Sequence, residues 1–224
     1  MSFHLDFLAL SHGHLDHTWG LTEIIRMFTQ AGLSGRPHQK PTVIAHPRTF
    51  VSSVAESFGE IGSMLSQDKL KRHFELRTGT EPVALTARLT WLGEIPRRTE
   101  FEGLDSFGFK TDDGQPDFMP DDTALVYQSE EGLVIITGCS HAGICNIVDR
   151  ARAVTGTDKV VDIIGGLHLQ EPSASQLSGT REYLGSLGLK GLHACHCTDL
   201  ASKVALAGSL PVREVGSGMR LEYR

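Results

Sequence analysis

The densest cluster of histidine and acidic side chains in this sequence is LSHGHLDH, residues Leu10–His17. It places three histidines and one aspartate within the six residues His12–His17. An apolar run of strand length, Leu5–Leu10, leads into it, and residues 21–28 follow with apolar side chains at helical spacing. Because α/β proteins place their chemistry at strand ends, we expect the cluster to lie in a loop after a buried strand.

The residue types of this loop predict a metal site. Imidazole and carboxylate groups are ligands for zinc, iron and manganese. Gly13 is expected to let the backbone turn tightly, so that His12 and His14 converge while Asp16 and His17 point to a second position. The alternative is a histidine-rich loop that binds nothing, and the regular spacing makes this the weaker hypothesis.

A strand, a histidine and a helix recur three times in the second half of the chain. Leu133–Thr137 is followed by His141, Val160–Ile164 by His168, and Gly191–Cys195 by His196. Such loops collect at one edge of a sheet. The pattern therefore predicts that these three histidines approach one site, together with the residues of the first loop.

The remaining elements follow from periodicity and from turn-forming residues. Helices are predicted at Leu21–Gly32, Arg48–Phe58, Ala142–Val154 with Ser140 as its N-cap, Ser173–Leu187 and Asp199–Ala207, and Gln67–Phe74 is a charged helix or a turn. Strands are predicted at Pro41–Pro47, Val83–Leu85, Arg88–Gly93 and Thr123–Gln128, with a closing hairpin of Val212–Val215 and Met219–Tyr223. The acidic stretch Asp112–Asp122 is either an exposed connection or a wall of the site.

Composition limits the classes of protein to consider. A chain of 224 residues with 40% hydrophobic content can bury one sizeable core, so a single domain over 1–224 is expected. The formal net charge is −6, and the basic run Lys69–Arg72 is interpreted as a solvated helix face, so nucleic acid is not a favoured partner.

The four cysteines form no CxxC pair, and neither a signal-peptide pattern nor a membrane-length apolar run is present. We therefore expect reduced thiols, no membrane partner and a cytoplasmic location.

Several motifs carry a resemblance to a known family. The string Ser11–His17 matches the signature of the metallo-β-lactamase superfamily of metal-dependent hydrolases. The strings Gly138–Ile144, Gly165–Leu169 and Cys195–Thr198 resemble the branch that includes the dihydropteroate-synthase-like enzymes of archaeal methanopterin biosynthesis. The resemblance extends in motif order over Asp6–Arg224.

The resemblance implies an α/β fold, the metallo-β-lactamase-like αββα sandwich, with two divalent metal ions. Zinc is expected first, with iron or manganese as alternatives. The implied ligands are His12, His14 and His141 for one ion, and Asp16, His17 and His196 for the other. A bridging aspartate is usual in the superfamily, but the corresponding strand end here reads Gly138–His141, and its Cys139 is interpreted as a buried structural thiol in preference to a soft ligand.

Catalytic roles are assigned to Asp16 and to His168. The His168 side chain could bind a substrate oxyanion or transfer a proton, and the alternative is a hydrogen-bonded structural histidine. His193 lies within a strand and is interpreted as structural or as a support for the site. The other histidines have no motif around them and are expected at the surface: His4, His38, His46 and His73.

The family resemblance also implies strands before the first histidine motif that this sequence does not contain. Their absence would leave an unpaired sheet edge and exposed apolar side chains on the strands near Asp6–Leu10 and Val43–Ala45. We therefore expect either a chain shorter than its functional form or self-association that covers this edge.

These observations predict a hydrolase that uses a metal-bound hydroxide on a small phosphorylated or cyclic-ester metabolite. The resemblance to the methanopterin branch implies that this substrate is related to a pterin. Two alternatives remain open. One is a non-catalytic remnant of the fold that binds metal or a partner, and the other is a nuclease, which the acidic charge opposes.

Overall fold

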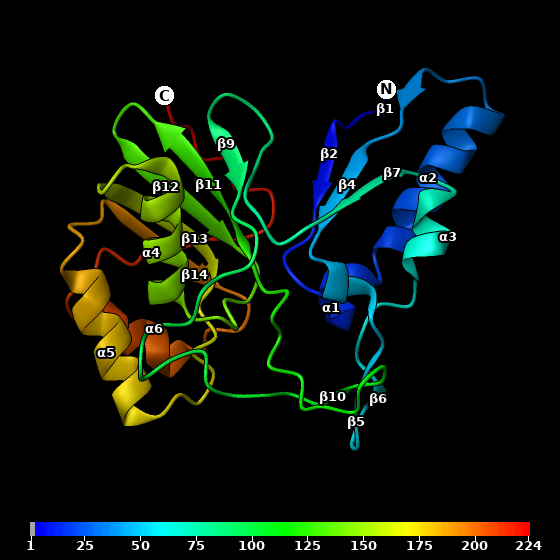
Figure 1. Ribbon diagram of the computed structural model, residues 1–224. Helices are drawn as coiled ribbons and strands as arrows, with labels where there is room; N and C mark the ends of the chain where they lie inside the picture. The colour runs from blue at the N-terminus through cyan, green and yellow to red at the C-terminus, as the bar shows by residue number, and fades with distance from the viewer. Residues whose placement is uncertain (1–2) are drawn as a thin grey trace. The chain divides into compact units, whose positions relative to one another are not determined.

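The computed structural model describes residues 3–224, and its contacts divide the chain into two compact units (Figure 1). The first unit contains the residues up to Thr80 together with Ser106–Asp121. The second contains Glu81–Asp105 and Asp122–Arg224. The chain therefore enters the second unit, returns to the first for one segment, and then completes the second. The single domain over 1–224 stays a prediction.

The first unit is built on a parallel sheet with the strand order β2-β4-β7. Its strands are β1 (Phe3–His4), β2 (Phe7–Ala9), β3 (His38–Gln39), β4 (Thr42–Ala45), β5 (Ser53–Ala55), β6 (Gly59–Glu60), β7 (Glu75–Thr78) and β10 (Phe109–Lys110). Its helical segments are α1 (Leu15–Thr18), α2 (Leu21–Leu33), the 3₁₀ turn η1 (Pro47–Phe50) and α3 (Gln67–Lys71). Smaller sheets pair β1 with β3, and β5 with both β6 and β10.

Helices α2 and α3 cover the β2-β4-β7 sheet with apolar side chains. Leu21 and Phe28 stand seven residues apart on α2, so they lie on one helix face, and both are buried. They join one apolar cluster with Val43 of β4 and Leu70 of α3, which are fully buried. This cluster is the core of the first unit and fixes the sheet behind the histidine loop.

The second unit contains a six-stranded sheet with the order β14-β13-β12-β11-β9-β8. Its strands are β8 (Val83–Ala84), β9 (Leu89–Trp91), β11 (Ala124–Ser129), β12 (Gly132–Thr137), β13 (Val160–Gly166) and β14 (Gly191–Cys195). Neighbours β12, β13 and β14 are parallel, and the remaining pairs are antiparallel. The parallel part is the one that the strand–histidine–helix pattern predicted.

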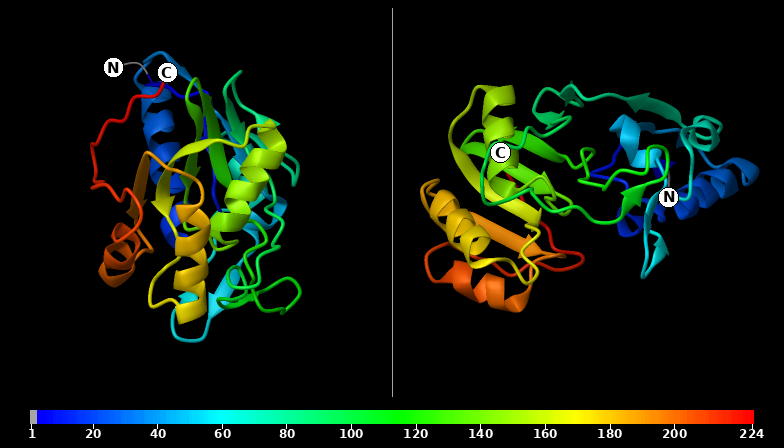
Figure 2. Two further views of the ribbon diagram at one scale, coloured as in Figure 1. Left: turned by 90° about the vertical axis from the view of Figure 1, so that its left-hand side faces the viewer. Right: turned by 60° about the horizontal axis from the view of Figure 1, so that its bottom comes forward.

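Three helices cover one face of this sheet (Figures 1 and 2). They are α4 (Ile144–Thr155), α5 (Ala174–Gly185) and α6 (Leu200–Ala207), each placed after a parallel strand. Ile147, Leu184 and Leu206 belong to three different helices, and all are fully buried in one apolar cluster with the sheet. Ser173 and Asp199 cap α5 and α6 by accepting backbone N–H bonds from Gln176 and Ser202. None of the helices within residues 3–224 is long and apolar enough to cross a bilayer.

Some sequence predictions are wrong because distant segments determine the local structure. The helix predicted over Arg48–Phe58 is instead the short turn η1 followed by strand β5, since Ser53 and Val54 pair with β10. The hairpin predicted after Val212 does not form a ladder. A turn does close at Gly216. Beyond it, the Tyr223 hydroxyl donates to Asp162 and the Arg224 carbonyl accepts from the Glu130 amide, so the last residues bind to the body of the second unit and not to each other.

Two further differences concern the ends of elements. The strand before the histidine loop was expected to be buried, but β2 is an edge strand of its sheet and Phe7 is 36% exposed. Self-association over this edge stays a prediction.

Ser140 does not cap α4, since its hydroxyl donates to the Gly166 carbonyl, and Gly143 occupies the N-cap position.

The N-terminus of α4 is capped from another segment. Glu102 accepts backbone N–H bonds from Cys145 and Asn146, at 3.3 and 2.8 Å, and is 3% exposed. A carboxylate suits the positive end of a helix. Gly143 has φ 94°, and a Cβ on it would lie 2.2 Å from the Glu102 side chain, so this arrangement requires glycine.

We predict that Gly143→Ala lowers the free energy of unfolding by about 2–5 kcal/mol, the sum of a left-handed backbone (~1–2) and overpacking against Glu102 (~1–3). Gly156→Ala is the matched control, because Gly156 also has positive φ but no atom lies within 4 Å of its would-be Cβ. Urea denaturation of both variants measures the difference. Equal losses would show that Glu102 does not depend on Gly143.

Candidate functional site

The predicted histidine loop follows strand β2 in the first unit, and its side chains do converge. His12 is fully buried and His14 is 9% exposed. His12 Nε2 and His14 Nδ1 lie 3.2 Å apart, and the ring centroids of His12 and His17 lie 4.2 Å apart. The exposed Asp16 carboxylate lies 3.3 Å from His17 Nε2. Four of the predicted ligands are therefore neighbours within one unit, as spacing alone suggested.

Gly13 has a different role from the predicted one. Its φ is not positive, so no special turn depends on it. Instead, a Cβ on Gly13 would lie 2.5 Å from the carbonyl oxygen of Thr49 and 3.2 Å from the Asp121 carboxylate. Glycine is required because other parts of the first unit approach the backbone between the two histidines.

The acidic stretch Asp112–Asp122 is only partly the exposed connection that was one interpretation. Asp112 and Asp113 are exposed and pair with Arg48. Asp117, in contrast, is 1% exposed and forms a buried ion pair of 3.0 Å with Lys110. Its carboxylate also accepts from Ser53 Oγ, at 2.9 Å. These bonds anchor the returning segment of the chain inside the first unit.

Asp121 lies at the end of this segment and was missed by the sequence analysis. It is 1% exposed, and neither carboxylate oxygen has a hydrogen-bond partner within residues 3–224. Buried carboxylates are normally paired, hydrogen-bonded or bound to a metal. The only sequence signal was the acid-rich loop, which could not show which aspartate is buried beside Gly13.

The electrostatics of His14 favour a neutral imidazole. Burial lowers the pKa of His14, and the negative charges of Asp121 and Asp117 oppose this shift. A neutral imidazole has the free lone pair that a metal ion requires. The local environment is thus suited to a ligand histidine more than to a charged surface histidine.

The second unit presents its candidate residues after the three parallel strands. Ser140, His168 and His196 follow β12, β13 and β14, and their φ angles are 65°, 51° and 52°. Left-handed backbone is uncommon for residues with a Cβ, costs about 1–3 kcal/mol each, and clusters at functional sites. All three strand ends are strained in the same way, which sequence patterns could not reveal.

His141 and His168 lie together within this unit. Their ring centroids are 4.2 Å apart, and His141 is 6% exposed. The side chain of Gln176 donates to the His168 carbonyl, so helix α5 helps to fix this strand end. His196 is exposed at the end of β14.

Cys197 is a second residue that sequence reasoning missed. Hydrogen bonding to Cys139 and then to His168 lowers the pKa of Cys197 to about 4. The bond to Cys197 is also the main cause that raises the pKa of His168. The Cys197 thiol donates to the Cys139 carbonyl, at 3.2 Å, which fixes its side chain beside this strand end. Cys139 is 5% exposed, as expected for a buried thiol.

A cavity of about 370 Å³ opens beside His168 within the second unit. The loop Glu100–Asp105 forms one side, and residues 170–176 before and within α5 form the other. Four carboxylates line it: Glu100, Glu102, Asp105 and Glu171. Its lining contains no lysine or arginine, so His168 is its one basic side chain.

The other histidines mostly match expectation. His193 is buried within β14 and its Nδ1 lies 2.9 Å from Asp162. His4, His38 and His73 are exposed. His46 is the exception: it is 4% exposed, and its Nδ1 accepts from the Arg48 amide to cap η1.

Comparison with known proteins supports the resemblance seen in the motifs. A protein of Methanocaldococcus jannaschii named 7,8-dihydropterin-6-methyl-4-(β-D-ribofuranosyl)-aminobenzene-5′-phosphate synthase is 30% identical over 204 residues, which is 87% of this chain and 66% of that protein. An uncharacterized protein of the same organism is 28% identical over 203 residues, 90% of this chain and 72% of its own length. This chain thus spans about two thirds of the length of the named relative.

The fold has a solved counterpart. The crystal structure of Tm1679, a metal-dependent hydrolase of the β-lactamase superfamily, superposes with a TM-score of 0.79 at 22% identity, covering 96% of this chain and 78% of that one. No protein-family model matches the sequence. The predicted metallo-β-lactamase-like α/β fold is confirmed.

We predict that Lys110→Met lowers the free energy of unfolding by about 3–5 kcal/mol, because it leaves Asp117 charged and buried without its cation. Arg26→Met is the control, since it breaks the exposed pair of Arg26 with Glu23 and should change stability little. Urea denaturation measures both. A Lys110→Met loss no greater than that of the control would mean that the ion pair does not anchor this segment.

Proposed function

We propose that this chain, which has the fold of the metallo-β-lactamase superfamily, is a metal-dependent hydrolase that acts on a small-molecule substrate. The fold and the relatives support an enzyme that uses a metal. The number of ions, the reaction and the substrate are the proposal.

One observation carries the proposal most strongly. The Asp121 carboxylate is 1% exposed, has no hydrogen-bond partner within the described residues, and lies beside the loop that contains His12 and His14. A buried charge of this kind is costly unless a cation balances it. A divalent ion bound by the neighbouring imidazoles would supply that charge, so the donor set fits the expected metal.

We propose the ligand set that the family resemblance implies. It consists of His12, His14, Asp16, His17, His141 and His196, for two divalent ions with zinc as the first candidate. When bound, such ions lower the pKa of a coordinated water towards neutrality and polarise the bond to be cleaved. Asp121 would contribute negative charge to the environment of the histidine loop.

The second unit supplies the groups proposed to act on the substrate. His168 lines the adjoining cavity, and in its protonated form it can donate a hydrogen bond or a proton to an oxyanion. The adjoining cavity is lined by carboxylates, which accept hydrogen bonds from N–H groups and repel phosphate. We propose that it takes the N–H-rich part of the substrate. A pterin-type ring fits this chemistry, and the named relative makes a dihydropterin compound.

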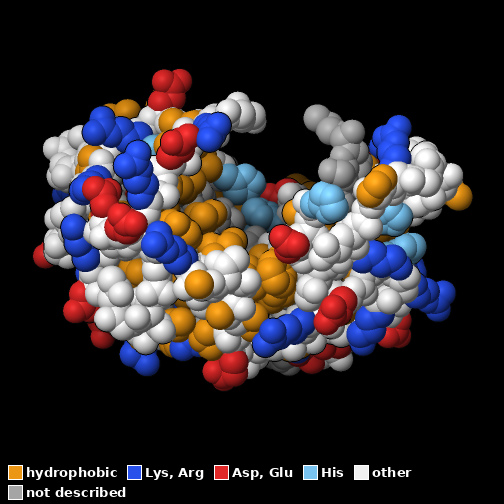
Figure 3. All heavy atoms as spheres, turned by 90° about the horizontal axis from the view of Figure 1, so that it is seen from above, with side chains coloured by type: hydrophobic (Ala, Val, Ile, Leu, Met, Phe, Trp, Pro, Cys, Tyr) orange, Lys and Arg blue, Asp and Glu red, His pale blue; other side chains and the backbone are white. Residues whose placement is uncertain are grey.

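A nuclease is the less supported candidate. Nucleic-acid affinity depends on basic side chains that contact phosphates. The chain has a formal net charge of −6, and on the face shown in Figure 3 basic and acidic side chains are interspersed. A substrate screen should therefore include phosphodiesters of single nucleotides as well as nucleic acids.

We predict that Asp121→Asn weakens zinc binding by about 10–100-fold, the range seen for groups that support metal ligands. In the metal-free protein the same change should raise the free energy of unfolding, because it removes a buried charge without a partner. Asp68→Asn, at an exposed position in the same unit, should change neither quantity. Calorimetric titration with zinc and urea denaturation after chelation measure both. Unchanged affinity together with lower metal-free stability would contradict the role given to Asp121.

We predict that elemental analysis finds about two divalent ions per chain, and that His12→Ala reduces this number because it removes a neutral imidazole ligand. His73→Ala, which changes an exposed histidine outside the motifs, is the control. Absence of zinc, iron and manganese after refolding with each metal would refute the metal assignment.

We predict that His168→Ala lowers turnover about 10²–10⁴-fold while the metal content stays intact, since His168 acts on the substrate and is not a ligand. The assay measures hydrolysis of phosphodiester, lactone and pterin substrates. Loss of one metal equivalent would instead make His168 a ligand. Full metal content with no turnover on any substrate would favour the non-catalytic alternative.

A further inference from the structure

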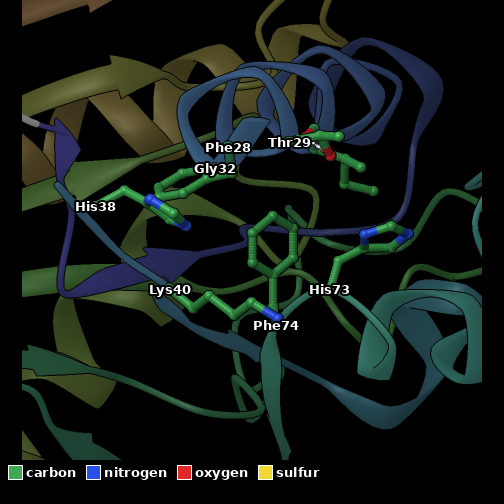
Figure 4. Close-up of a pocket in the computed structure, with 8 residues that line it drawn as sticks. Phe28, Thr29, Gly32, His38, Lys40, His73 and Phe74 are labelled. Carbon is green, nitrogen blue, oxygen red and sulfur yellow. Dashed lines mark hydrogen bonds between the residues drawn. The ribbon is translucent and has the colours of Figure 1, made fainter. Parts of the chain in front are cut away.

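A second cavity lies in the first unit, against the C-terminal half of helix α2. Its volume is about 220 Å³, and Figure 4 shows its lining. Helix α2 contributes Ile25, Phe28, Thr29 and Gly32, and the other side chains are His38, Lys40, His73 and Phe74. It shares no residue with the histidine loop Leu10–His17, so it stands apart from the metal chemistry proposed above.

The floor of this cavity is aromatic and firmly placed. Phe28 is 7% exposed and Phe74 is 4% exposed, and both belong to the core of the first unit. Their rings meet edge to face, with centroids 5.8 Å apart at 84°. In the view of Figure 4, Phe74 lies in the middle of the cavity. The two fixed rings form an apolar surface on which a flat apolar ligand can pack without rearrangement of the protein.

The rim of the cavity contains basic side chains and no acidic ones. Its ionisable side chains are His38, Lys40 and His73, and no carboxylate lines the cavity. In Figure 4, His38 and Lys40 lie towards one side of Phe74 and His73 towards the other. All three are exposed, and no ion pair involving them is found among the described residues. The positive charge of Lys40 is therefore available to a ligand and is not used to hold the fold together.

The backbone defines which ring nitrogen of His38 faces the cavity. His38 Nδ1 lies 2.9 Å from the Arg36 carbonyl, so Nδ1 carries the proton and donates that bond. The opposite edge of the ring, with Cε1 and Nε2, faces Gly32 of α2. Its ring also packs against Phe28, with centroids 6.2 Å apart. His38 is thus oriented by this hydrogen bond and by its contact with Phe28.

We propose that this cavity binds a small anion with an aromatic or short apolar body, such as an aromatic carboxylate or an aryl phosphate ester. The apolar part would lie on Phe28 and Phe74, and the anionic group would contact the Lys40 ammonium group. The volume is below the roughly 300–1,000 Å³ of sites for drug-sized ligands, so the ligand is a small metabolite. The proposal is independent of the metal-dependent function.

The first experiment is an NMR titration of the isotopically labelled full chain. Benzoate and phenyl phosphate should shift the amide signals of Thr29, Gly32 and Lys40, and the two probes distinguish a carboxylate from a phosphate head. Inorganic phosphate should bind more weakly, because it has no apolar part. Benzylamine, with the same ring and a positive charge, should not bind. Shifts by benzylamine as strong as those by benzoate would overturn the proposal, and so would shifts by neither anion.

The second experiment uses matched variants at exposed positions. Lys40→Met keeps most of the apolar stem but removes the charge, and should weaken binding of the better anion about tenfold, as expected for loss of one charged contact. Lys69→Met, on helix α3 and outside the cavity, should leave binding unchanged. Equal effects of the two variants would show non-specific attraction to surface charge and would refute a built site. Circular dichroism of both variants checks that each retains the fold.

Discussion

Parallel strand pairing is the constraint on which both units depend. In the first unit β2, β4 and β7 run parallel, and in the second β12, β13 and β14 do. Parallel strands end at the same edge of their sheet. Strand direction therefore places the histidine loop after β2 at one edge of the first sheet. In the same way it places the residues after β12, β13 and β14 at one edge of the second sheet. No side-chain contact is needed to bring them to that edge.

The strained backbone and the buried charges near these strand ends cost free energy, and other parts of the fold offset that cost. Three strand ends hold Ser140, His168 and His196 in left-handed backbone, and the first unit buries Asp117 and Asp121. Lys110 neutralises Asp117. The apolar clusters under α2 and under α4 supply the burial that keeps these strained and charged positions in place.

The net charge of the chain does not predict the charge of the side chains that line its two cavities. The chain is acidic overall, yet the cavity of the first unit has a rim of Lys40 and histidines without a carboxylate. The cavity beside His168 has the opposite lining, with carboxylates and no lysine or arginine. The two cavities therefore differ in the charge of their linings.

The sequence by itself determined that the histidines of the first loop lie together and that strand, histidine and helix recur three times. These depend on local spacing, and strands β12, β13 and β14 are found where periodicity predicted them. The helix predicted over Asp199–Ala207 is also found, as α6, and Asp199 caps it through a contact between near neighbours.

Only the tertiary structure decided which acidic residues are buried, why Gly13 is a glycine and how Ser53–Ala55 folds. Asp121 is buried beside Gly13, more than one hundred residues away in the chain, and β5 is a strand because β10 returns to pair with it. Burial and pairing depend on which distant segment comes close, and a pattern of neighbours along the chain does not contain that information.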